Sequence, residues 1–185
     1  MWIVGTIIIL IVGYGILTFN RLVRAANVVE EAWSGIDVQL KRRYDLVPNL
    51  VIAVQEYAEH EKTVFENVAQ ARSESMNTYA PSEKGPAENQ LSAQIKSLFA
   101  VAEAYPNVKA SQNFMRLQKE LTEVEDQIQY ARRYYNGAVR DYNILVQVFP
   151  NYILASMMGY AKEDFFEIEY ATERTAPEVD LQKKT

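Results

Sequence analysis

The sequence has no cysteine and a single histidine among its 185 residues. The lack of cysteine excludes disulfides, thiolate metal sites, cysteine nucleophiles and lipid attachment through a thiol. The one histidine, His60, has glutamates around it but no second histidine at the spacing of a helical metal site. We therefore expect no metal, and we interpret this stretch as a charged, solvated helix face.

Glycine and basic charge are also scarce. Seven glycines occur, and none forms a phosphate-binding loop. The 19 basic side chains are outnumbered by 24 acidic ones, for a net charge of −5, so nucleic acid is not an expected partner. No nucleophile can be paired with a base. The sequence thus predicts a protein that is not an enzyme and that has no cofactor or small-molecule substrate.

The first 19 residues contain no charged side chain. As a helix rising ~1.5 Å per residue they would extend roughly 28 Å, which matches the hydrocarbon core of a bilayer. An apolar run lies between aromatic residues of the kind that favour membrane interfaces. The residues of this predicted anchor are Trp2, Ile7, Ile8, Ile9, Leu10, Ile11, Tyr14 and Phe19. Because a basic leading region and a small-residue cleavage site are missing, we predict a retained anchor over residues 1–19 rather than a cleaved signal.

Two arginines follow the predicted anchor, Arg21 and Arg24, whereas only the terminal amine precedes it. Basic residues next to a span favour the cytoplasmic side. The expected topology is therefore a single pass, with the N-terminus outside and the rest of the chain in the cytoplasm.

Beyond the anchor, apolar residues recur at alternating steps of three and four, which is typical of helices packed along one side. The first such seam runs from Leu22 to Ala71 and is interrupted at Arg43 and Glu61. It predicts one long helix over about residues 20–79.

Pro48 lies inside that predicted helix. Proline lacks a backbone donor and crowds the carbonyl four residues earlier, which predicts a kink near residues 44–48. A complete break there is the alternative.

Residues 79–86 contain two prolines and a glycine and predict a loop. A shorter helix should follow, from about Leu91 to Tyr105, and Ser111 is a candidate cap for the next one. That next helix has the most regular seam, about five heptads long, which predicts coiled-coil-like packing. Its residues are Phe114, Leu117, Leu121, Val124, Ile128, Ala131, Tyr135, Ala138, Tyr142, Leu145 and Phe149.

No pair of strands is evident, and short connections force neighbouring helices to be antiparallel. The predicted fold is all-α, with an N-terminal transmembrane helix followed by an elongated antiparallel three- to four-helix bundle over residues 20–160. Residues 166–170 alternate with period two, and the end of the chain is polar. We therefore expect residues 161–185 to form an extended and then disordered tail.

The densest charge cluster is the run Lys41-Arg42-Arg43-Tyr44-Asp45. In one interpretation it is a binding patch for a partner, an anionic lipid or a phosphate. In the other, Arg43 occupies a seam position and is held in the core by a carboxylate, which fixes the register of the helices. Asp141 is the expected partner of Arg43, with Asp45 and Glu123 as further candidates.

Several blocks of the chain resemble the LemA family. They are AWSGIDVQLKRRYDLVPNLV at 32–51, YAEHE at 57–61, ARS at 71–73, AYP at 104–106, FMRLQKEL at 114–121, ARRYYN at 131–136, YN at 142–143 and FP at 149–150. The likeness covers nearly the whole chain. It implies a protein of the bacterial inner membrane with a helical bundle, but no reaction, because the family has no agreed catalytic residues to carry over.

Three functional hypotheses remain open. The first is a non-catalytic scaffold or adaptor, anchored in the bilayer by its N-terminal helix, that self-associates or recruits protein partners. The second is a membrane-shaping or envelope-stress protein that acts directly on lipid, with residues 152–158 as an apolar contact; capping the bundle core is the plainer role of that segment. The third is an accessory factor of a neighbouring membrane enzyme.

Overall fold

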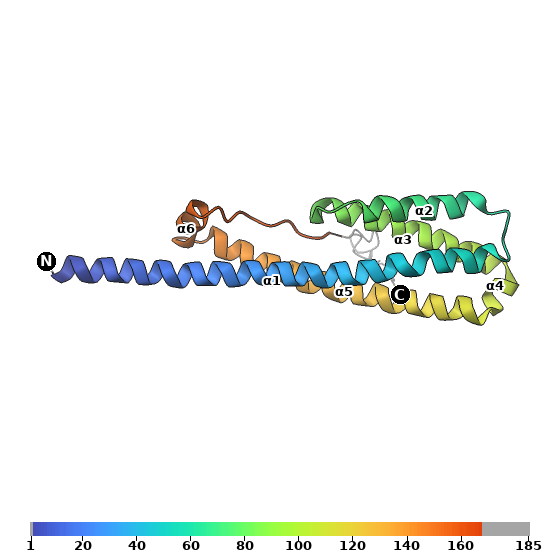
Figure 1. Cartoon of the computed structure of the whole chain (residues 1–185), viewed down its shortest axis with the longest axis horizontal. Coiled ribbons are helices and arrows are strands. Elements are labelled where there is room, and N and C mark those ends of the chain that lie inside the picture. The colour runs from blue at the N-terminus through green and yellow to red at the C-terminus, as the bar shows by residue number, and fades with distance from the viewer. Residues whose placement is uncertain (1, 168–185) are drawn as a thin grey trace, which may run out of the picture.

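The computed structural model describes residues 2–167, and in that range it contains six helices and no strand. They are α1 (Trp2–Gln55), α2 (Lys62–Met76), α3 (Pro81–Ala104), α4 (Pro106–Ala110), α5 (Gln112–Gln147) and α6 (Asn151–Met157). Figure 1 shows α1, α2, α3 and α5 running alternately in opposite directions along the long axis of the molecule. The predicted all-α antiparallel bundle is confirmed, while coiled-coil packing stays a prediction.

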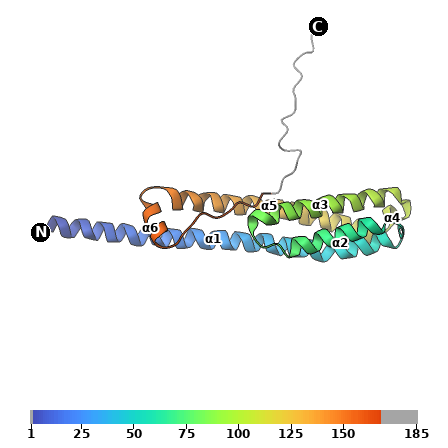
Figure 2. The same cartoon turned by 90° about the horizontal axis from the view of Figure 1, so that it is seen from above.

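The bundle is thicker at one end than at the other. Helices α1 and α5 form a long antiparallel pair, and the α2–α3 hairpin packs only against the half far from the N-terminus (Figures 1 and 2). The apolar core follows this layout, because all four helices bury seam residues such as Ile36, Val68, Leu98 and Val124. The first turns of α1 project beyond the other helices.

Helix α1 is long and apolar enough to cross a membrane, judged by its length and composition; within residues 2–167 it is the one helix that meets this test. Its most apolar window has a mean hydropathy of 2.3 and is 6% buried in the fold. The predicted anchor and the first bundle helix form one unbroken helix through Phe19 and Asn20.

The single helix predicted over residues 20–79 is wrong. Helix α1 ends at Gln55, residues 56–61 turn, and α2 returns antiparallel to α1. Both helices bury their apolar faces in one core, so the seam continues across the turn although the helix does not. Periodicity reports that each segment has an apolar face, not that two successive faces belong to one helix.

A complete break at Pro48 does not occur, since α1 runs through it. Pro48 cannot donate to the carbonyl of Tyr44, but Arg72 of α2 donates to that oxygen instead. The freed acceptor is therefore satisfied, and the helix tolerates the proline.

The predicted loop over residues 79–86 is also wrong, because α3 begins at Pro81. A first-turn residue has no helical partner for its N–H, so proline at this position costs little. Ser111 does precede α5, as expected of a cap, but its side chain makes no capping hydrogen bond.

The buried face of α5 includes the predicted seam residues Tyr135 and Tyr142, and it becomes wider beyond Tyr135. Val139, Asn143 and Val146 are buried, whereas Leu145 is half-buried and Phe149, 78% exposed, lies outside the core. The face is wider because this part of α5 packs against a further segment besides α1, namely residues 160–167.

That segment has no regular secondary structure and lies along α5. Asn143 exchanges two hydrogen bonds with the backbone of Glu163, and Asn136 does the same with Phe166. Asn136 and Asn143 are seven residues apart, or about 10.5 Å along a helix, and Glu163 and Phe166 are three residues apart, or about 10 Å along an extended chain. The two asparagines are therefore spaced to bind these two backbone positions. The predicted extended arm is present up to Glu167, and its continuation, including the predicted disorder, lies outside the described residues.

Candidate functional site

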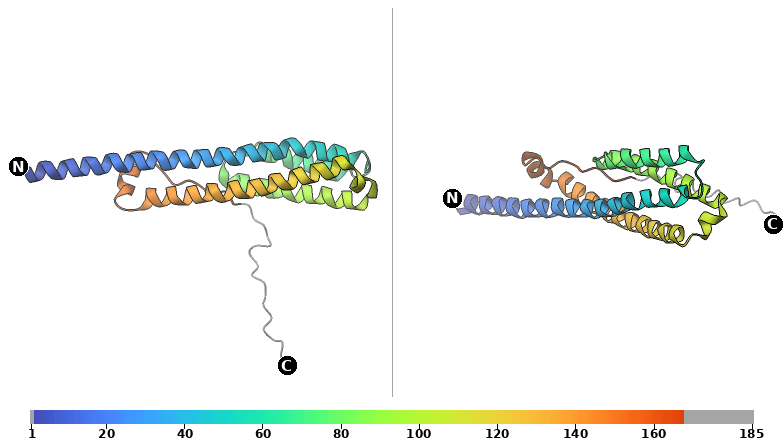
Figure 3. Two further views of the ribbon diagram at one scale, coloured as in Figure 1. Left: turned by 90° about the horizontal axis from the view of Figure 1, so that it is seen from below. Right: turned by 45° about the vertical axis from the view of Figure 1, so that its right-hand side comes forward.

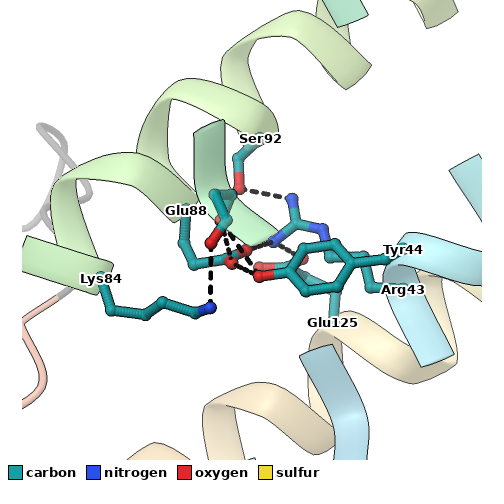
Figure 4. Close-up of polar contacts among 7 residues, drawn as sticks. Arg43, Tyr44, Lys84, Glu88, Ser92 and Glu125 are labelled. Atoms are coloured by element: carbon teal, nitrogen blue, oxygen red, sulfur yellow. Dashed lines mark hydrogen bonds and ion pairs between the residues drawn. The ribbon is translucent and has the colours of Figure 1, made fainter. Parts of the chain in front are cut away.

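Arg43 lies in the interior of the bundle, with 3% of its surface exposed. Its Nη1 atom is 3.2 Å from Oε2 of Glu88 and 3.6 Å from Oε2 of Glu125, and its Nη2 atom donates to Oγ of Ser92 over 2.6 Å. Figure 4 shows these side chains converging from three helices. Arg43 is therefore held in the core by carboxylates, as one of the two interpretations required.

Tyr44 extends the same cluster towards α2. Its hydroxyl donates to Oε1 of Glu88 and lies 3.1 Å from Oγ of Ser75, which also donates to Oε1 of Glu88. Burial, followed by the charge of Glu88, raises the pKa of the Tyr44 phenol well above its ordinary value. The phenol thus remains a donor over the whole physiological pH range.

Lys84 closes the cluster at the end of α2. Its ammonium donates to the carbonyl oxygens of Ser75 and Thr78, each over 2.9 Å, and lies 5.5 Å from the centre of the Tyr44 ring. Burial lowers the pKa of Lys84, while Glu88 and Asp37 act in the opposite direction. Lys84 thus supplies donors at the C-terminal end of α2, to Ser75 in its last turn and to Thr78 just beyond it.

Together these side chains connect four helices: the Glu88 carboxylate joins α1, α2 and α3, and Arg43 extends the network to α5. Arg43 and Tyr44 come from α1, Ser75 from α2, Glu88 from α3, and Glu125 approaches Arg43 from α5. A buried, mutually satisfied network of this kind adds little net stability but penalises any arrangement that leaves one member unpaired. The network therefore specifies which helices pair and in which register, rather than supporting a reaction.

A cavity of about 260 Å³ lies beside this cluster, between α3 and α5. Ile95, Phe99 and Leu121 form its apolar wall, and Arg43 and Glu125 lie at its polar end. The volume is below that of ordinary small-molecule sites, about 300–1,000 Å³. No group of three or more metal-ligating side chains occurs in residues 2–167.

The residues of the predicted cluster at 41–45 point to different sides of α1. Arg43 and Tyr44 point into the core, whereas Arg42 and Asp45 are exposed on the opposite side of α1. The structural interpretation therefore applies to the first pair, and the partner-binding interpretation stays a prediction for the second.

Asp141 is the wrong partner for Arg43. Its carboxylate is 73% exposed and lies 3.1 Å from Arg140. Glu123 likewise pairs with a surface lysine, Lys119. The prediction failed because α5 runs past α1 in a register that brings Glu125, and not Asp141, to the level of Arg43.

The sequence did contain a signal for the residues that were missed. Stepping back from Leu91 by three and then four positions along the α3 seam reaches Glu88 and Lys84. One further step of four beyond Ala71 on the α2 seam reaches Ser75. Two neighbouring helices, α2 and α3, thus each carry polar residues at seam positions, as α1 does at Arg43.

The predicted anchor residues lie on the part of α1 that projects from the bundle. Trp2, Ile7, Ile8, Ile9, Leu10 and Ile11 are all exposed, as a lipid-facing segment requires. Tyr14 and Phe19 lie closer to the bundle, and the Tyr14 hydroxyl donates to Oδ1 of Asn151 over 2.6 Å.

Comparison with known proteins gives consistent matches. The sequence profile of the LemA family matches residues 32–181. The chain is 24% identical to magnetosome protein MamQ 2 of Paramagnetospirillum magneticum over 178 residues, which covers 82% of this chain and 65% of that protein. It is 23% identical to magnetosome protein MamQ of Magnetospirillum gryphiswaldense over 177 residues, with coverage of 82% and 65%. It is 28% identical to protein LemA of Metamycoplasma hominis over 134 residues, with coverage of 70% and 60%. The chain thus spans at most 65% of the length of these curated relatives.

Proposed function

Since this chain belongs to the LemA family, we propose that it is a non-catalytic scaffold or adaptor, anchored in the bacterial inner membrane by α1, that self-associates or recruits protein partners. The family and the relatives named as magnetosome proteins support a membrane-associated helical protein. The finer assignment, a scaffold, is inferred from how the bundle uses its polar residues.

The observation that carries this proposal is the network around Glu88. Its donors come from α1 and α2, so the polar groups in the interior are engaged in holding helices together. A network of this kind gives one rigid arrangement of the bundle. A rigid arrangement suits a protein that presents a fixed surface to partners.

The length of α1 supports a scaffold whose binding surface stands away from the membrane. From Arg21 to Gln55 the helix rises about 50 Å at ~1.5 Å per residue. Because α1 is continuous from the candidate span into the bundle, a rigid helix rather than a flexible linker connects the span to the bundle.

The outer face of α5 offers one candidate contact surface. Tyr130 and Tyr134 are both exposed and one helical turn apart, and the Arg133 guanidinium lies 4.7 Å from the centre of the Tyr130 ring. Tyrosine and arginine are enriched among the residues that dominate binding energy at protein interfaces. Arg42 and Asp45 form a second candidate on α1.

Self-association can be tested on the full-length protein in detergent. Light scattering should give a multiple of the 21.2 kDa chain mass. Replacing Tyr134 by alanine should reduce that mass or abolish cross-linking to a partner in native membranes. Tyr57→Ala, at an exposed tyrosine in the turn between α1 and α2 at the far end of the bundle, is the control. A monomer that forms no discrete cross-links through position 134 or position 42 would contradict the proposal.

The proposed topology places the bundle in the cytoplasm, which follows from Arg21 and Arg24. A reporter fused after Thr185 that is active only in the cytoplasm should be active. Activity of an export-dependent reporter at the same position would reverse the orientation and leave the scaffold role intact.

The alternative, direct action on lipid, is favoured by α6, which leaves several apolar side chains exposed beside the candidate span. Electron microscopy of reconstituted vesicles tests it. Vesicles that change shape in proportion to the amount of protein would favour this function. Unchanged vesicles would contradict it and leave the scaffold as the proposed function.

A further inference from the structure

We propose that residues 148–159, which include α6, lie in the membrane interface and form a second lipid contact beside the span. The inference rests on the anchoring of α1 that is part of the proposed function. It adds a fixed membrane contact to the scaffold role, independent of any change in membrane shape, and it commits to the bilayer as the occupant of this surface.

The first argument is the level of α6 along α1. The hydrogen bond between Tyr14 and Asn151 fixes the start of α6 beside the span. Tyr14 precedes Arg21, the first charged side chain of the chain, by seven residues, or about 10 Å of helix. Figure 3 shows α6 beside α1 at the end of the bundle nearest the N-terminus. Helix α6 therefore lies on the membrane side of the first charge.

The second argument is the surface that this segment exposes. Helix α6 contributes only Ala155 to the buried core, so it closes the end of the bundle with one small side chain. The large apolar side chains around it are exposed, and Met157 is 80% exposed. They are Val148, Phe149, Tyr152, Ile153, Met157 and Met158. Six large apolar side chains exposed within one short stretch of the chain favour an interaction site there.

The third argument is that three segments of the chain lose their charged side chains at the same height along the axis of α1. Residues 142–161 contain no charged side chain, and Asp141 and Lys162 flank them. The bonds between Asn143 and Glu163 show that the returning chain is again at the level of Asn143 when its charges resume. A groove of about 420 Å³ brings Asp141 together with Arg21. The charge-free boundary is thus shared by α1, α5 and the tail.

A bilayer surface explains a common boundary of this kind. Charged side chains remain at the headgroup level, whereas apolar side chains enter the acyl boundary by about 5–10 Å. The depth of α6 beyond Arg21 agrees with that range. Arg21 and Arg24 lie at the height where anionic phosphates would be, and Tyr14 and Asn151 satisfy each other's polar groups below it.

A second copy of the chain is the competing occupant of this surface. It would have to cover α6 at a height where the neighbouring face of the span, including Ile16 and Leu17, is also exposed and apolar. The bilayer covers both surfaces at once, and for this reason we favour it.

The absence of cysteine makes a depth measurement direct. Single substitutions M157C, L10C and M115C in the full-length protein would each carry an environment-sensitive fluorophore. The proteins would be reconstituted into phosphatidylcholine–phosphatidylglycerol vesicles that contain spin-labelled lipids as quenchers. Met115 is an exposed methionine at the far end of the bundle and serves as the matched control.

The label at position 10 should be quenched by deep spin labels, the label at 157 by shallow ones, and the label at 115 by neither. Emission at 157 should also shift to shorter wavelength when vesicles replace a lipid-free micelle of short-chain detergent. Quenching at 10 without quenching at 157 overturns the interfacial contact and leaves the anchor intact. No quenching at 10 overturns the anchor, and the inference with it. A label at 157 that becomes shielded only as protein concentration rises identifies a second copy as the occupant and also overturns the inference.

Discussion

Arg72 donates its Nε hydrogen to the main-chain carbonyl oxygen of Tyr44 over 2.7 Å. That oxygen lies four residues before Pro48, which has no amide hydrogen to offer it. The proline that interrupts the hydrogen bonds of α1 therefore creates an acceptor for α2. A position where a helix ordinarily breaks has become a contact between two antiparallel helices.

This relationship predicts a coupling between Arg72 and Pro48. Arg72→Ala should lower the free energy of unfolding by about 1–3 kcal/mol, because a partly buried carbonyl loses its donor. In a Pro48→Ala background the new amide at position 48 can supply the helical bond, so the same change should cost clearly less. Denaturant unfolding of the four proteins in detergent, followed by circular dichroism, measures the coupling. Equal costs in both backgrounds would show that Arg72 stabilises the fold by another contact.

The buried cluster around Arg43 predicts a large loss of stability when Glu88, a residue with no exposed surface, is replaced. Glu88→Gln removes the carboxylate nearest to Arg43 and leaves the more distant and partly exposed Glu125, 3.6 Å away, which compensates the buried guanidinium only in part. We expect a loss of about 3 kcal/mol, since breaking a buried pair leaves an uncompensated charge. Asp141→Asn, at an exposed carboxylate, should change stability by less than about 0.5 kcal/mol. Comparable losses for the two variants would contradict the assignment of Glu88 as the partner of Arg43.

The tail segment predicts a local effect that leaves the bundle folded. Replacing Asn136 and Asn143 by alanine removes four hydrogen bonds to Glu163 and Phe166, so cleavage by trypsin after Lys162 should become faster. Gly85→Ala should act similarly without touching either asparagine, because a Cβ atom there would lie 1.9 Å from the carbonyl oxygen of Glu167. Gly137→Ala, where a Cβ atom meets nothing, is the control. Unchanged cleavage in all variants would show that other contacts hold the tail.

Three buried tyrosines predict a loss of stability in alkali. Burial, with nearby carboxylates, raises the pKa of Tyr44 and raises that of Tyr135 to about 12, and burial also raises that of Tyr142. The folded state then holds protons that the unfolded state releases near pH 10. Each contribution is complete below about pH 10, and that of Tyr135 is lost as the pH rises through about 12. Lys84, with its lowered pKa, acts in the opposite direction but is a single group.

Parallel titration of phenolate absorbance and helical circular dichroism checks this expectation. A subset of tyrosines should ionise only as the helices unfold, and that subset should shrink in Tyr135→Phe. Ionisation of every tyrosine near pH 10 with the helices intact would contradict the burial of these phenols.

The sequence by itself determined the helices as apolar-faced segments and the position of the candidate span. Both are local properties: a seam repeats every three or four residues, and a span is a continuous apolar run. Seam positions such as Ile36 and Leu121 were therefore predicted correctly as core. Even Arg43, a charge at a seam position, could be recognised as a residue that needs a carboxylate.

Only the tertiary structure decided which faces meet. The turn at residues 56–61, the pairing of Arg43 with Glu88, and the docking of Phe166 beside Asn136 all join segments distant in sequence. Each depends on the register in which whole helices pack, and that register minimises a sum of long-range contacts that no single segment contains. The contact between Arg72 and Tyr44 is a further example. The sequence predicts from Pro48 that the carbonyl of Tyr44 lacks its helical donor, but only the folded bundle shows that Arg72 supplies one.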